Sequence, residues 1–319
     1  MKPLVLVIGS YNQDLYWQTP DFPQPGQTCV GRFSTLPGGK GSNQAVACAR
    51  LGVPTAFCGA VGEDTFGRAL PAFYRSEGIE EHLVFKRDQP TGNAAIWVNS
   101  EGENEIVISA GANGLLDPAD IPQSVLCQAR LLVCQNESCP ATMSWVFEQA
   151  HANGVTTLLN PAPMRADFPL EMLRHTDILA PNQSEFVELV GRLGVAPEPT
   201  FGLQELAALS HGELHRLCRQ LGVPTVIITL GKDGCFVDQE KEYAHVNACG
   251  GIEVVDTTGA GDAFIGGLSA HLVEKSEGAL AAARFASAVA ALCVTKKGAT
   301  PAMPTRDQVE TFLADVGAG

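Results

Sequence analysis

The stretch DTTGAGDAFIGG at residues 256–267 is a glycine-rich turn that runs directly into an apolar helical segment. Gly259 and Gly261 let backbone N–H groups converge without a Cβ in the way, and the helix start leaves unpaired N–H donors and a partial positive charge. Such a turn suits an oxyanion or a phosphoryl group. Asp262 in the first helical turn could accept a proton from a hydroxyl nucleophile, as phosphotransfer requires. A capped helix start, in which Asp262 only complements the helix dipole, explains these residues equally well.

A second glycine cluster, PGGKGSNQA at residues 37–45, also opens a helical segment. It is not a Walker A loop, because that loop needs Gly-Lys followed directly by Ser or Thr and Gly41 intervenes here. Its three glycines let a polyhydroxylated ligand approach the backbone closely, with Lys40 and Asn43 beside them as donors for hydroxyl groups. Taken alone, the cluster is also explained by the end of one element followed at once by a helix start.

Composition indicates a cytoplasmic enzyme. The chain has 319 residues, of which 45% are hydrophobic, and this is ample for a sizeable core. The net charge of −14 argues against a nucleic-acid partner, which draws on clustered Lys and Arg. No apolar run approaches the roughly 20 residues of a membrane span, so no membrane partner is expected. The ten cysteines include no Cys-x-x-Cys pair, which predicts reduced thiols and neither disulfides nor a cysteine metal site.

Short β-branched runs alternate with segments of helical spacing, which is typical of an α/β fold with a parallel sheet. The pattern predicts buried strands at residues 4–8, 56–61, 131–134, 156–159, 178–180 and 226–230. Helical spacing falls at residues 42–51, 65–76, 141–152, 183–190 and 211–220. Two regions, 12–35 and 93–109, break the alternation, and the second predicts a β-hairpin. The Pro-rich stretch 192–212 predicts a surface insertion.

Together the two glycine clusters resemble the ribokinase group of the PfkB sugar kinases, and the likeness extends over nearly the whole chain. Further supporting stretches are GSYNQD at 9–14, VGED at 61–64, GEN at 102–104, AGAN at 110–113, LNPAP at 159–163, APNQSE at 180–185, ITLG at 228–231 and VTKKGA at 294–299. The resemblance implies a single domain over residues 1–319 with a ribokinase-like three-layer α/β/α core and a mostly parallel sheet. It also implies that residues 12–35 and 93–109 form a small β-sheet lid, inserted in the core and lying over the sugar.

The resemblance places the sugar among polar side chains and glycines, namely Asn12, Asp14, Gly38, Gly39, Lys40, Gly41, Asn43 and Glu137, with Asp262 beneath the reactive hydroxyl. Ionised Asp14 and Glu137 accept hydroxyl donors from a polyol, and Lys40 and Asn43 supply the complementary donors. Without the resemblance, Asp14 is explained as an ordinary turn former and Glu137 as a solvated charge at a strand end.

For ATP, the resemblance offers six residues near the adenine and the phosphates, which are Asn182, Thr229, Gly231, Gly234, Gly261 and Ser287. Asn182 and Glu185 match an Asn-x-x-Glu arrangement that the family uses to hold Mg²⁺ largely through water, which suits an ion that sheds its hydration reluctantly. Asn182 also precedes a helical segment, so it can serve as a helix cap at the same time.

The family also carries a site for a monovalent cation, K⁺. The resemblance places this site at Asp256, Thr258, Cys293, Lys296, Gly298 and Ala302. Most of these residues would act through backbone carbonyls, so their side-chain identities carry little information.

The resemblance implies in-line transfer of the ATP γ-phosphoryl group to the terminal hydroxyl of a pentose, the 5-hydroxyl of D-ribose. Asp262 is then the general base, the amides of Gly259, Ala260 and Gly261 stabilise the transferring group, and Mg²⁺ neutralises the phosphates. Residues 93–109 contain no Lys or Arg, which favours a neutral polyol over a phosphosugar. Another neutral sugar, such as 2-deoxyribose or a ketose, and a nucleoside remain open as substrates.

Two other classes of protein fit these residues less well than a kinase. A catalytically inactive sugar-sensing protein on the same fold is the first, and the intact Asp262 with its glycines counts against it. An NAD-dependent oxidoreductase is the second, and it fails because only Gly9 is present where Gly-x-Gly-x-x-Gly demands three glycines.

The hairpin at residues 93–109 also predicts an oligomer. A small sheet that projects from a domain leaves one face and one edge open to water. We therefore expect a homodimer that pairs two lids about a twofold axis and buries Ile96, Val98, Ile106 and Ile108 more fully. A lid that simply closes on its own domain is the alternative.

Overall fold

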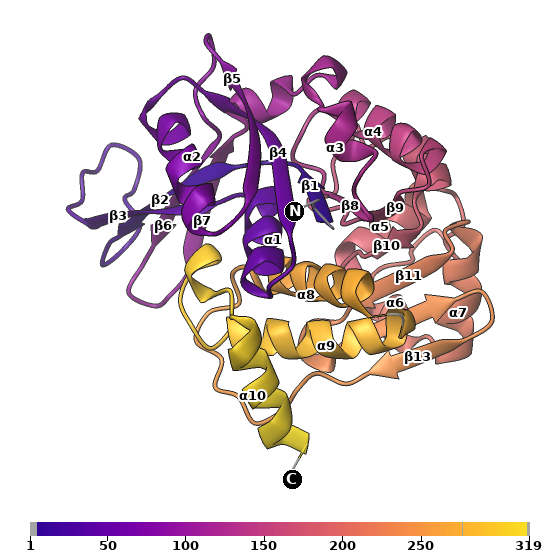
Figure 1. Cartoon of the computed structure of the whole chain (residues 1–319). Helices are drawn as coiled ribbons and strands as arrows, with labels where there is room; N and C mark the ends of the chain where they lie inside the picture. The colour runs from indigo at the N-terminus through magenta and orange to yellow at the C-terminus, as the bar shows by residue number, and fades with distance from the viewer. Residues whose placement is uncertain (1–4, 276, 318–319) are drawn as a thin grey trace.

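A nine-stranded sheet runs through the computed structural model, which describes residues 5–275 and 277–317 (Figure 1). The strand order is β13-β12-β11-β10-β9-β8-β1-β4-β5. Neighbours are parallel from β5 through β11, and β12 and β13 extend the sheet by two antiparallel pairings. The strands are β1 (Val5–Ile8), β4 (Thr55–Gly62), β5 (Glu80–Lys86), β8 (Leu131–Cys134), β9 (Thr156–Leu159), β10 (Ile178–Leu179), β11 (Thr225–Thr229), β12 (Cys235–Gln239) and β13 (Tyr243–Val246).

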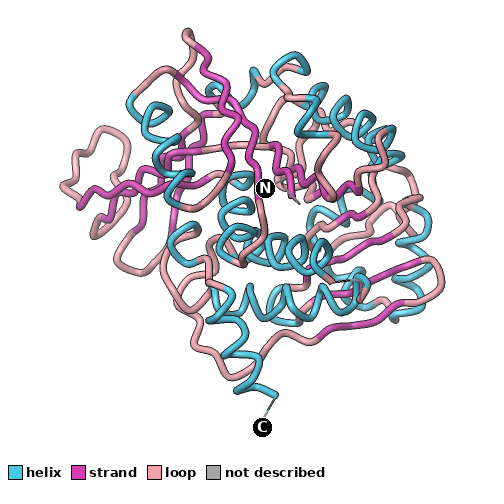
Figure 2. The backbone as a smooth tube through the Cα atoms, viewed as in Figure 1, coloured by secondary structure: helices cyan, strands magenta, loops and turns pink. Residues whose placement is uncertain are grey.

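Helices cover both faces of this sheet (Figure 2). Along the fully buried β1, Val5 and Val7 belong to one core, and Leu6 and Ile8 belong to the core on the other face. The first core includes side chains of α1 (Lys40–Arg50), α2 (Thr65–Ser76), α8 (Ala260–Glu274), α9 (Gly278–Cys293) and α10 (Arg306–Gly317). The second includes side chains of α3 (Gln123–Leu126), α4 (Pro140–Ala152), α5 (Gln183–Arg192), α6 (Leu203–Ala208) and α7 (His211–Gln220). The result is the three-layer α/β/α arrangement that the sequence predicts.

A separate four-stranded sheet lies beside the body, at the left of Figure 1. Its strands are β2 (Asn12–Gln18), β3 (Arg32–Gly38), β6 (Asn93–Val98) and β7 (Asn104–Ser109), in the order β3-β2-β6-β7. The central pair β2–β6 is parallel and the two outer pairs are antiparallel. Asn12 pairs with Gly38, so the sheet brings the residues after β1 next to the glycine cluster before α1. The edge strand β7 is exposed along its whole length.

Most predicted elements are confirmed, with small shifts at their ends. The strands at 131–134 and 156–159 match β8 and β9, and the predicted hairpin is β6–β7. Leu4, the predicted start of the first strand, lies outside the described residues. The strands β5, β12 and β13 were not predicted, and neither was α9, whose alanine-rich sequence lacks a polar face. The stretch 192–212 contains the short helix α6, whose Leu206 is buried.

In the described part of the chain, five short 3₁₀-helices complete the fold. They are η1 (Gly111–Leu115), η2 (Pro118–Asp120), η3 (Leu170–His175), η4 (Gly231–Asp233) and η5 (Thr300–Ala302). Within residues 5–275 and 277–317, no helix combines the length and the apolar character that spanning a membrane requires.

Candidate active site

The glycine-rich turn ends where α8 begins, at Ala260. Gly259 precedes the helix with φ of 78°, in the left-handed region, and a Cβ there would lie 2.8 Å from the Cα atom of Ala299. Gly261 differs, because a Cβ at this position would meet open space. In the described part of the chain, no side chain caps this helix start. The Ala260 N–H donates to the carbonyl oxygen of Thr257 over 3.2 Å, and the turn leaves the N–H groups of Gly259 and Gly261 as donors at the positive end of the helix dipole.

Asp262 is held in this first turn by two side-chain amides from α1. Asn43 Nδ2 donates to Oδ2 of the carboxylate over 2.9 Å, and Gln44 Nε2 donates to Oδ1 over 2.9 Å. Asp262 is only 7% exposed, so these donors replace the water that burial removes. Since each carboxylate oxygen has two lone pairs, both oxygens can still accept a hydroxyl proton.

Gln44 is part of a buried network at the carboxyl ends of the central strands. Gln135 Nε2, just beyond β8, donates to Gln44 Oε1 over 2.6 Å. Gln44 Nε2 also lies 3.1 Å from Asn160 Oδ1, and Asn160 in turn donates to the carbonyl oxygen of Ala180 over 2.9 Å. These three polar side chains were not predicted as site residues, although Gln44 belongs to the second glycine cluster. They align the amide that orients Asp262.

Two further carboxylates face the same space from the small sheet and from the end of β8. Burial, with the charges of Glu137 and Asp262, raises the pKa of Asp14 to about 7. Glu137 accepts a hydrogen bond from the Ser10 hydroxyl and another from the backbone N–H of Lys40, the latter over 3.1 Å. Glu137 and Asp262 are thus close enough to Asp14 to raise its pKa, and the three carboxylates together offer acceptors for hydroxyl groups.

Close backbone approaches shape this space. A Cβ on Gly38 would lie 2.3 Å from Asp14 Oδ2, and a Cβ on Gly39 would lie 2.5 Å from the backbone nitrogen of Asn12. Asn12 is 5% exposed, and its Oδ1 accepts a hydrogen bond from Asn113 Nδ2 over 3.0 Å, which leaves its own amide as a donor. Asn113 belongs to a stretch that supports the family likeness, but the sequence did not predict a role for it in the site.

Lys40 carries the positive charge that balances these acids. Burial alone would lower the pKa of Lys40, but the charges of Asp262, Glu137 and Glu185 outweigh it and the pKa is raised. The ammonium group therefore stays protonated amid three carboxylates and can attract an anionic group that enters the site.

A cavity of about 460 Å³ lies against the first turn of α8 and against α9. Five of the six predicted nucleotide residues line it, namely Thr229, Gly231, Gly234, Gly261 and Ser287. Ser287 turns its hydroxyl toward its own helix, where it donates to the carbonyl oxygen of Ala283 over 2.9 Å. The other walls are mainly apolar and include Ile252, Val254, Phe264 and Val294, which the sequence did not single out. Such a slot suits the flat face of a nucleobase.

Asn182 and Glu185 form a reciprocal cap at the start of α5. Asn182 Oδ1 accepts from the Glu185 N–H over 2.9 Å, and Glu185 Oε2 accepts from the Asn182 N–H over 2.8 Å. The cap that the sequence suggested for Asn182 is therefore confirmed. Burial and the charge of Asp262 raise the pKa of Glu185 against the lowering effects of the Asn182 N–H and Lys40. Oε1 of Glu185 remains available to a further donor, so this pair fits a role in holding Mg²⁺ through water.

Four of the six predicted cation residues are in contact beside the glycine-rich turn, namely Asp256, Thr258, Cys293 and Gly298. Asp256 accepts hydrogen bonds from the backbone N–H and the hydroxyl of Thr258 and from the backbone N–H of Gly298, over 2.6 to 2.9 Å. Burial opposes ionisation of Asp256, but these donors and Lys297 lower its pKa overall. The thiol of Cys293 lies 3.9 Å from the carbonyl oxygen of Thr258. Lys296 is exposed and Ala302 is buried. Backbone carbonyls of such loops are oxygen donors of the kind that coordinate K⁺.

Known proteins with the same architecture were found in three comparisons. The family model described as "pfkB family carbohydrate kinase" matches residues 2–306. A ribokinase of Haemophilus influenzae is 37% identical over 319 residues, covering 98% of this chain and 99% of the relative. The structure of ribokinase from Giardia lamblia matches with a TM-score of 0.87 at 37% identity, covering 99% of both chains. That of Arabidopsis thaliana ribokinase complexed with ribose and ATP matches with a TM-score of 0.83 at 31% identity, covering 98% of this chain and 99% of the other. The predicted fold class is confirmed.

Proposed function

The chain belongs to the PfkB family of carbohydrate kinases, and on that premise we propose that it transfers the γ-phosphoryl group of ATP to the 5-hydroxyl of D-ribose, giving ribose 5-phosphate and ADP. One observation carries the proposal. The buried Asp262 lies near the carboxylates of Asp14 and Glu137, in the first turn of a helix whose Ala260 and Gly261 line a cavity of nucleotide size.

In the proposed reaction, the sugar hydroxyl oxygen forms a bond to the γ-phosphorus as the bond to the β–γ bridging oxygen breaks. ADP leaves with the electron pair of that bond, and the hydroxyl proton passes to a free lone pair of Asp262. The amides of Gly259, Ala260 and Gly261 would stabilise the charge on the transferring group. Glu185 and Asn182 would hold Mg²⁺ through water, and the ion when bound neutralises the ATP phosphates.

The sugar would lie between Asn12, Asp14, Glu137 and the backbone of residues 38–41, with the small sheet as its lid. Two carboxylates that face the ligand repel a phosphosugar and accept from a neutral polyol. The same chemistry admits 2-deoxyribose, a ketose or a nucleoside, and the intact base argues against a catalytically inactive sensor. A phosphotransfer assay over free sugars and nucleosides tests the proposal. Kcat/KM highest for D-ribose supports it, and higher kcat/KM for a nucleoside or no transfer to any acceptor overturns it.

We propose further that K⁺ raises the activity. The loop of Asp256, Thr258 and Gly298 lies next to the glycine-rich turn, so a cation bound to its carbonyls would order the amides that meet the phosphoryl group. Initial rates in K⁺, Na⁺ and tetramethylammonium buffers at matched ionic strength check this proposal. Equal rates in the three buffers would contradict it.

A homodimer joined through the small sheet is also proposed. Ile106 and Ile108 on β7 are 50% and 58% exposed, whereas Ile96 on β6 is already buried within the chain. Pairing two such sheets would cover the exposed edge strand. Light scattering at micromolar concentration tests it, because a fully active particle with the mass of one chain is incompatible with the dimer.

A cytoplasmic location is proposed on the chemistry of the cysteines. All ten are free thiols in the structure, and this state is typical of a reducing compartment. Cell fractionation followed by detection of the protein checks this proposal, and recovery from a secreted fraction would contradict it.

A further inference from the structure

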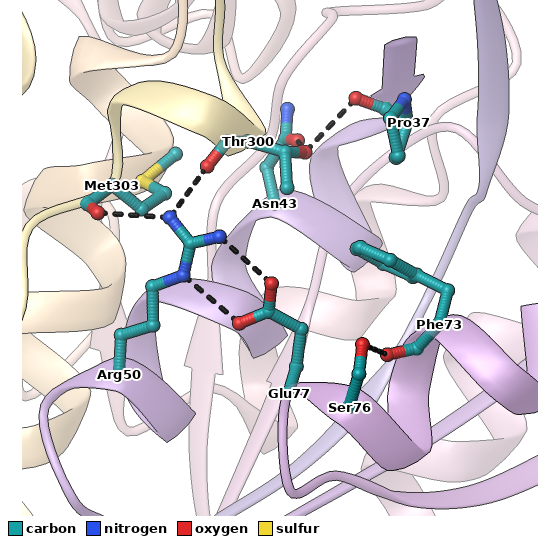
Figure 3. A network of polar contacts seen from close by, with 8 residues as sticks. All are labelled: Pro37, Asn43, Arg50, Phe73, Ser76, Glu77, Thr300 and Met303. Atoms are coloured by element: carbon teal, nitrogen blue, oxygen red, sulfur yellow. Dashed lines mark hydrogen bonds and ion pairs between the residues drawn. The ribbon is translucent and has the colours of Figure 1, made fainter.

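Thr300 donates a buried hydroxyl to the second glycine cluster. It is 2% exposed, at the start of η5, and its Oγ1 lies 2.6 Å from Asn43 Oδ1 and 2.9 Å from the carbonyl oxygen of Pro37 (Figure 3). Both acceptors belong to residues 37–45, far away in sequence. A hydroxyl has one proton, so the two acceptors share it, and the shorter contact is the one to Asn43.

The contact matters because Asn43 also holds Asp262. Its side-chain amide has one oxygen and one NH₂ group, which point in different directions. The NH₂ group donates to Asp262, and the oxygen accepts from Thr300. If the Thr300 hydroxyl were removed, the buried oxygen of Asn43 would lose its donor, and the amide would be free to rotate away from the carboxylate.

The turn that carries Thr300 is attached to α1 at a second point. Arg50, at the end of α1, donates to the carbonyl oxygens of Thr300 and Met303 over 2.9 and 3.0 Å. The same guanidinium forms a two-pronged ion pair with Glu77, over 2.9 and 2.7 Å (Figure 3). Bidentate pairs fix the plane of the guanidinium group, so η5 is held rigidly against α1.

We propose that Thr300 is a positioning residue for phosphoryl transfer, which orients Asp262 by holding the Asn43 amide. This inference rests on the proposed role of Asp262 as the base. Thr300 has no hydrogen bond to Asp262, and its effect on the carboxylate passes through the side chain of Asn43. The short helix η5 would then set the direction in which the base presents its free lone pair.

The variant Thr300→Val tests the proposal, because it removes the hydroxyl and keeps the branched shape. We expect kcat with D-ribose and ATP to fall about tenfold, because the carboxylate is still present but no longer well aligned to accept the hydroxyl proton. Thr300→Ser retains the hydroxyl and should restore kcat to within about twofold of the parent. Should the valine variant fail to fold because its methyl group crowds Asn43, Thr300→Ala removes the hydroxyl and the crowding together.

Thr142→Val is a matched control. Thr142 is 1% exposed and donates its hydroxyl to the carbonyl oxygen of Leu116 over 2.6 Å, on the opposite face of the sheet. The control should lower Tm while kcat per folded molecule stays at the parental value. A fall of kcat in Thr300→Val that only matches the control, or a serine variant as slow as the valine variant, would overturn the inference.

The double variant Thr300→Val, Asp262→Asn separates this inference from the proposed function. Positioning predicts that Thr300→Val lowers kcat no further once Asp262 is replaced, because both changes act on the same proton acceptor. An additional tenfold fall in the double variant overturns positioning through Asp262. A normal kcat in Asp262→Asn alone overturns the proposed base itself, and with it the premise of the inference.

Discussion

The two sides of Asp262 are built from different parts of the amino acids. On the side proposed for the sugar, Asp14, Asn43 and Glu137 present side-chain polar atoms, and long-range hydrogen bonds from buried groups hold two of them in place. On the side proposed for the nucleotide, the cavity is made of glycines, backbone and apolar walls, and the hydroxyl of Ser287 turns back to its own helix.

This difference follows from what each ligand offers. Sugar hydroxyls need directional acceptors and donors, which only side chains supply in several directions at once. Phosphate oxygens are satisfied by backbone N–H groups at a helix start, and a nucleobase by a flat apolar slot. Substitutions on the sugar side should therefore act on rate and on pH dependence, and those on the nucleotide side should act through shape.

The largest effect is expected from Asp262→Asn. The amide cannot accept the hydroxyl proton as a carboxylate does, so kcat should fall by about 10²-fold or more. ATP affinity should change little, because the cavity is unaltered. Steady-state rates with D-ribose and a separate ATP-binding titration check both parts. A kcat within threefold of the parent, roughly 0.65 kcal/mol on the transition-state scale, would show that Asp262 is not the general base.

A pH effect should come next, from Asp14. In the proposed site its carboxyl group would bind sugar hydroxyls as the anion. We therefore expect kcat/KM for D-ribose to fall about tenfold per pH unit below pH about 7, the pKa to which burial, Glu137 and Asp262 raise it. ATP phosphates titrate nearby, with a pKa of about 6, so the Asp14→Asn variant is the control. This variant should bind sugar weakly at every pH, and its kcat/KM should no longer fall below pH about 7 because of Asp14. An unchanged fall of kcat/KM in that variant would assign the titration to another group.

The raised pKa also has a consequence for stability. The folded protein binds the Asp14 proton more readily than the unfolded chain, whose pKa is near 3.8. The contribution of Asp14 to the free energy of unfolding is therefore full below pH about 3.8 and is lost as the pH rises through about 7. Urea denaturation of the parent and of Asp14→Asn between pH 5 and pH 8 measures it. A difference between the two proteins that does not change with pH would contradict the raised pKa.

Substitutions of two glycines on the nucleotide side should separate an effect on ATP binding from an effect on folding stability. A Cβ on Gly261 meets open space, so Gly261→Ala should leave Tm unchanged or slightly higher but raise KM for ATP about tenfold, about 1.4 kcal/mol, by obstructing the phosphates. Gly259→Ala should instead destabilise folding by about 1–2 kcal/mol, because an L-residue resists its positive φ. Gly212→Ala in α7 is the control for helix stabilisation alone. Equal KM values in the Gly261 and Gly212 variants would place the phosphates elsewhere.

The smallest effect is expected at Ser287. Its hydroxyl already donates to Ala283, and alanine is a better helix former, so Ser287→Ala should change KM for ATP by less than about twofold. Titration of the rate with ATP at saturating D-ribose measures this. A tenfold rise in KM would mean that the hydroxyl turns to the nucleotide. Both sides of Asp262 would then bind their ligands through polar side-chain atoms.

Local patterns predicted the elements that carry the strongest periodicity. The apolar runs of β8 and β9 are short, β-branched or leucine-rich, and bounded by turn residues, and they were placed to the residue. The alanine-rich α9, the interior strand β12 and the edge strand β13 were not predicted, because their composition lacks a contrast between polar and apolar faces. The assignment of the site residues came from the family likeness rather than from the spacing, and it stays a prediction.

What a sequence can establish by local physics is the kind of backbone each segment prefers and the donors or acceptors it carries. The glycine-rich turns, the position of Asp262 in a first helical turn and the alternating strands were all readable in this way. Which groups orient Asp262 was not, because Gln44 and Thr300 act across 218 and 257 positions of chain. Such contacts exist only once the strand ends and the last turn pack around α1, and burial then makes each hydrogen bond costly to lose.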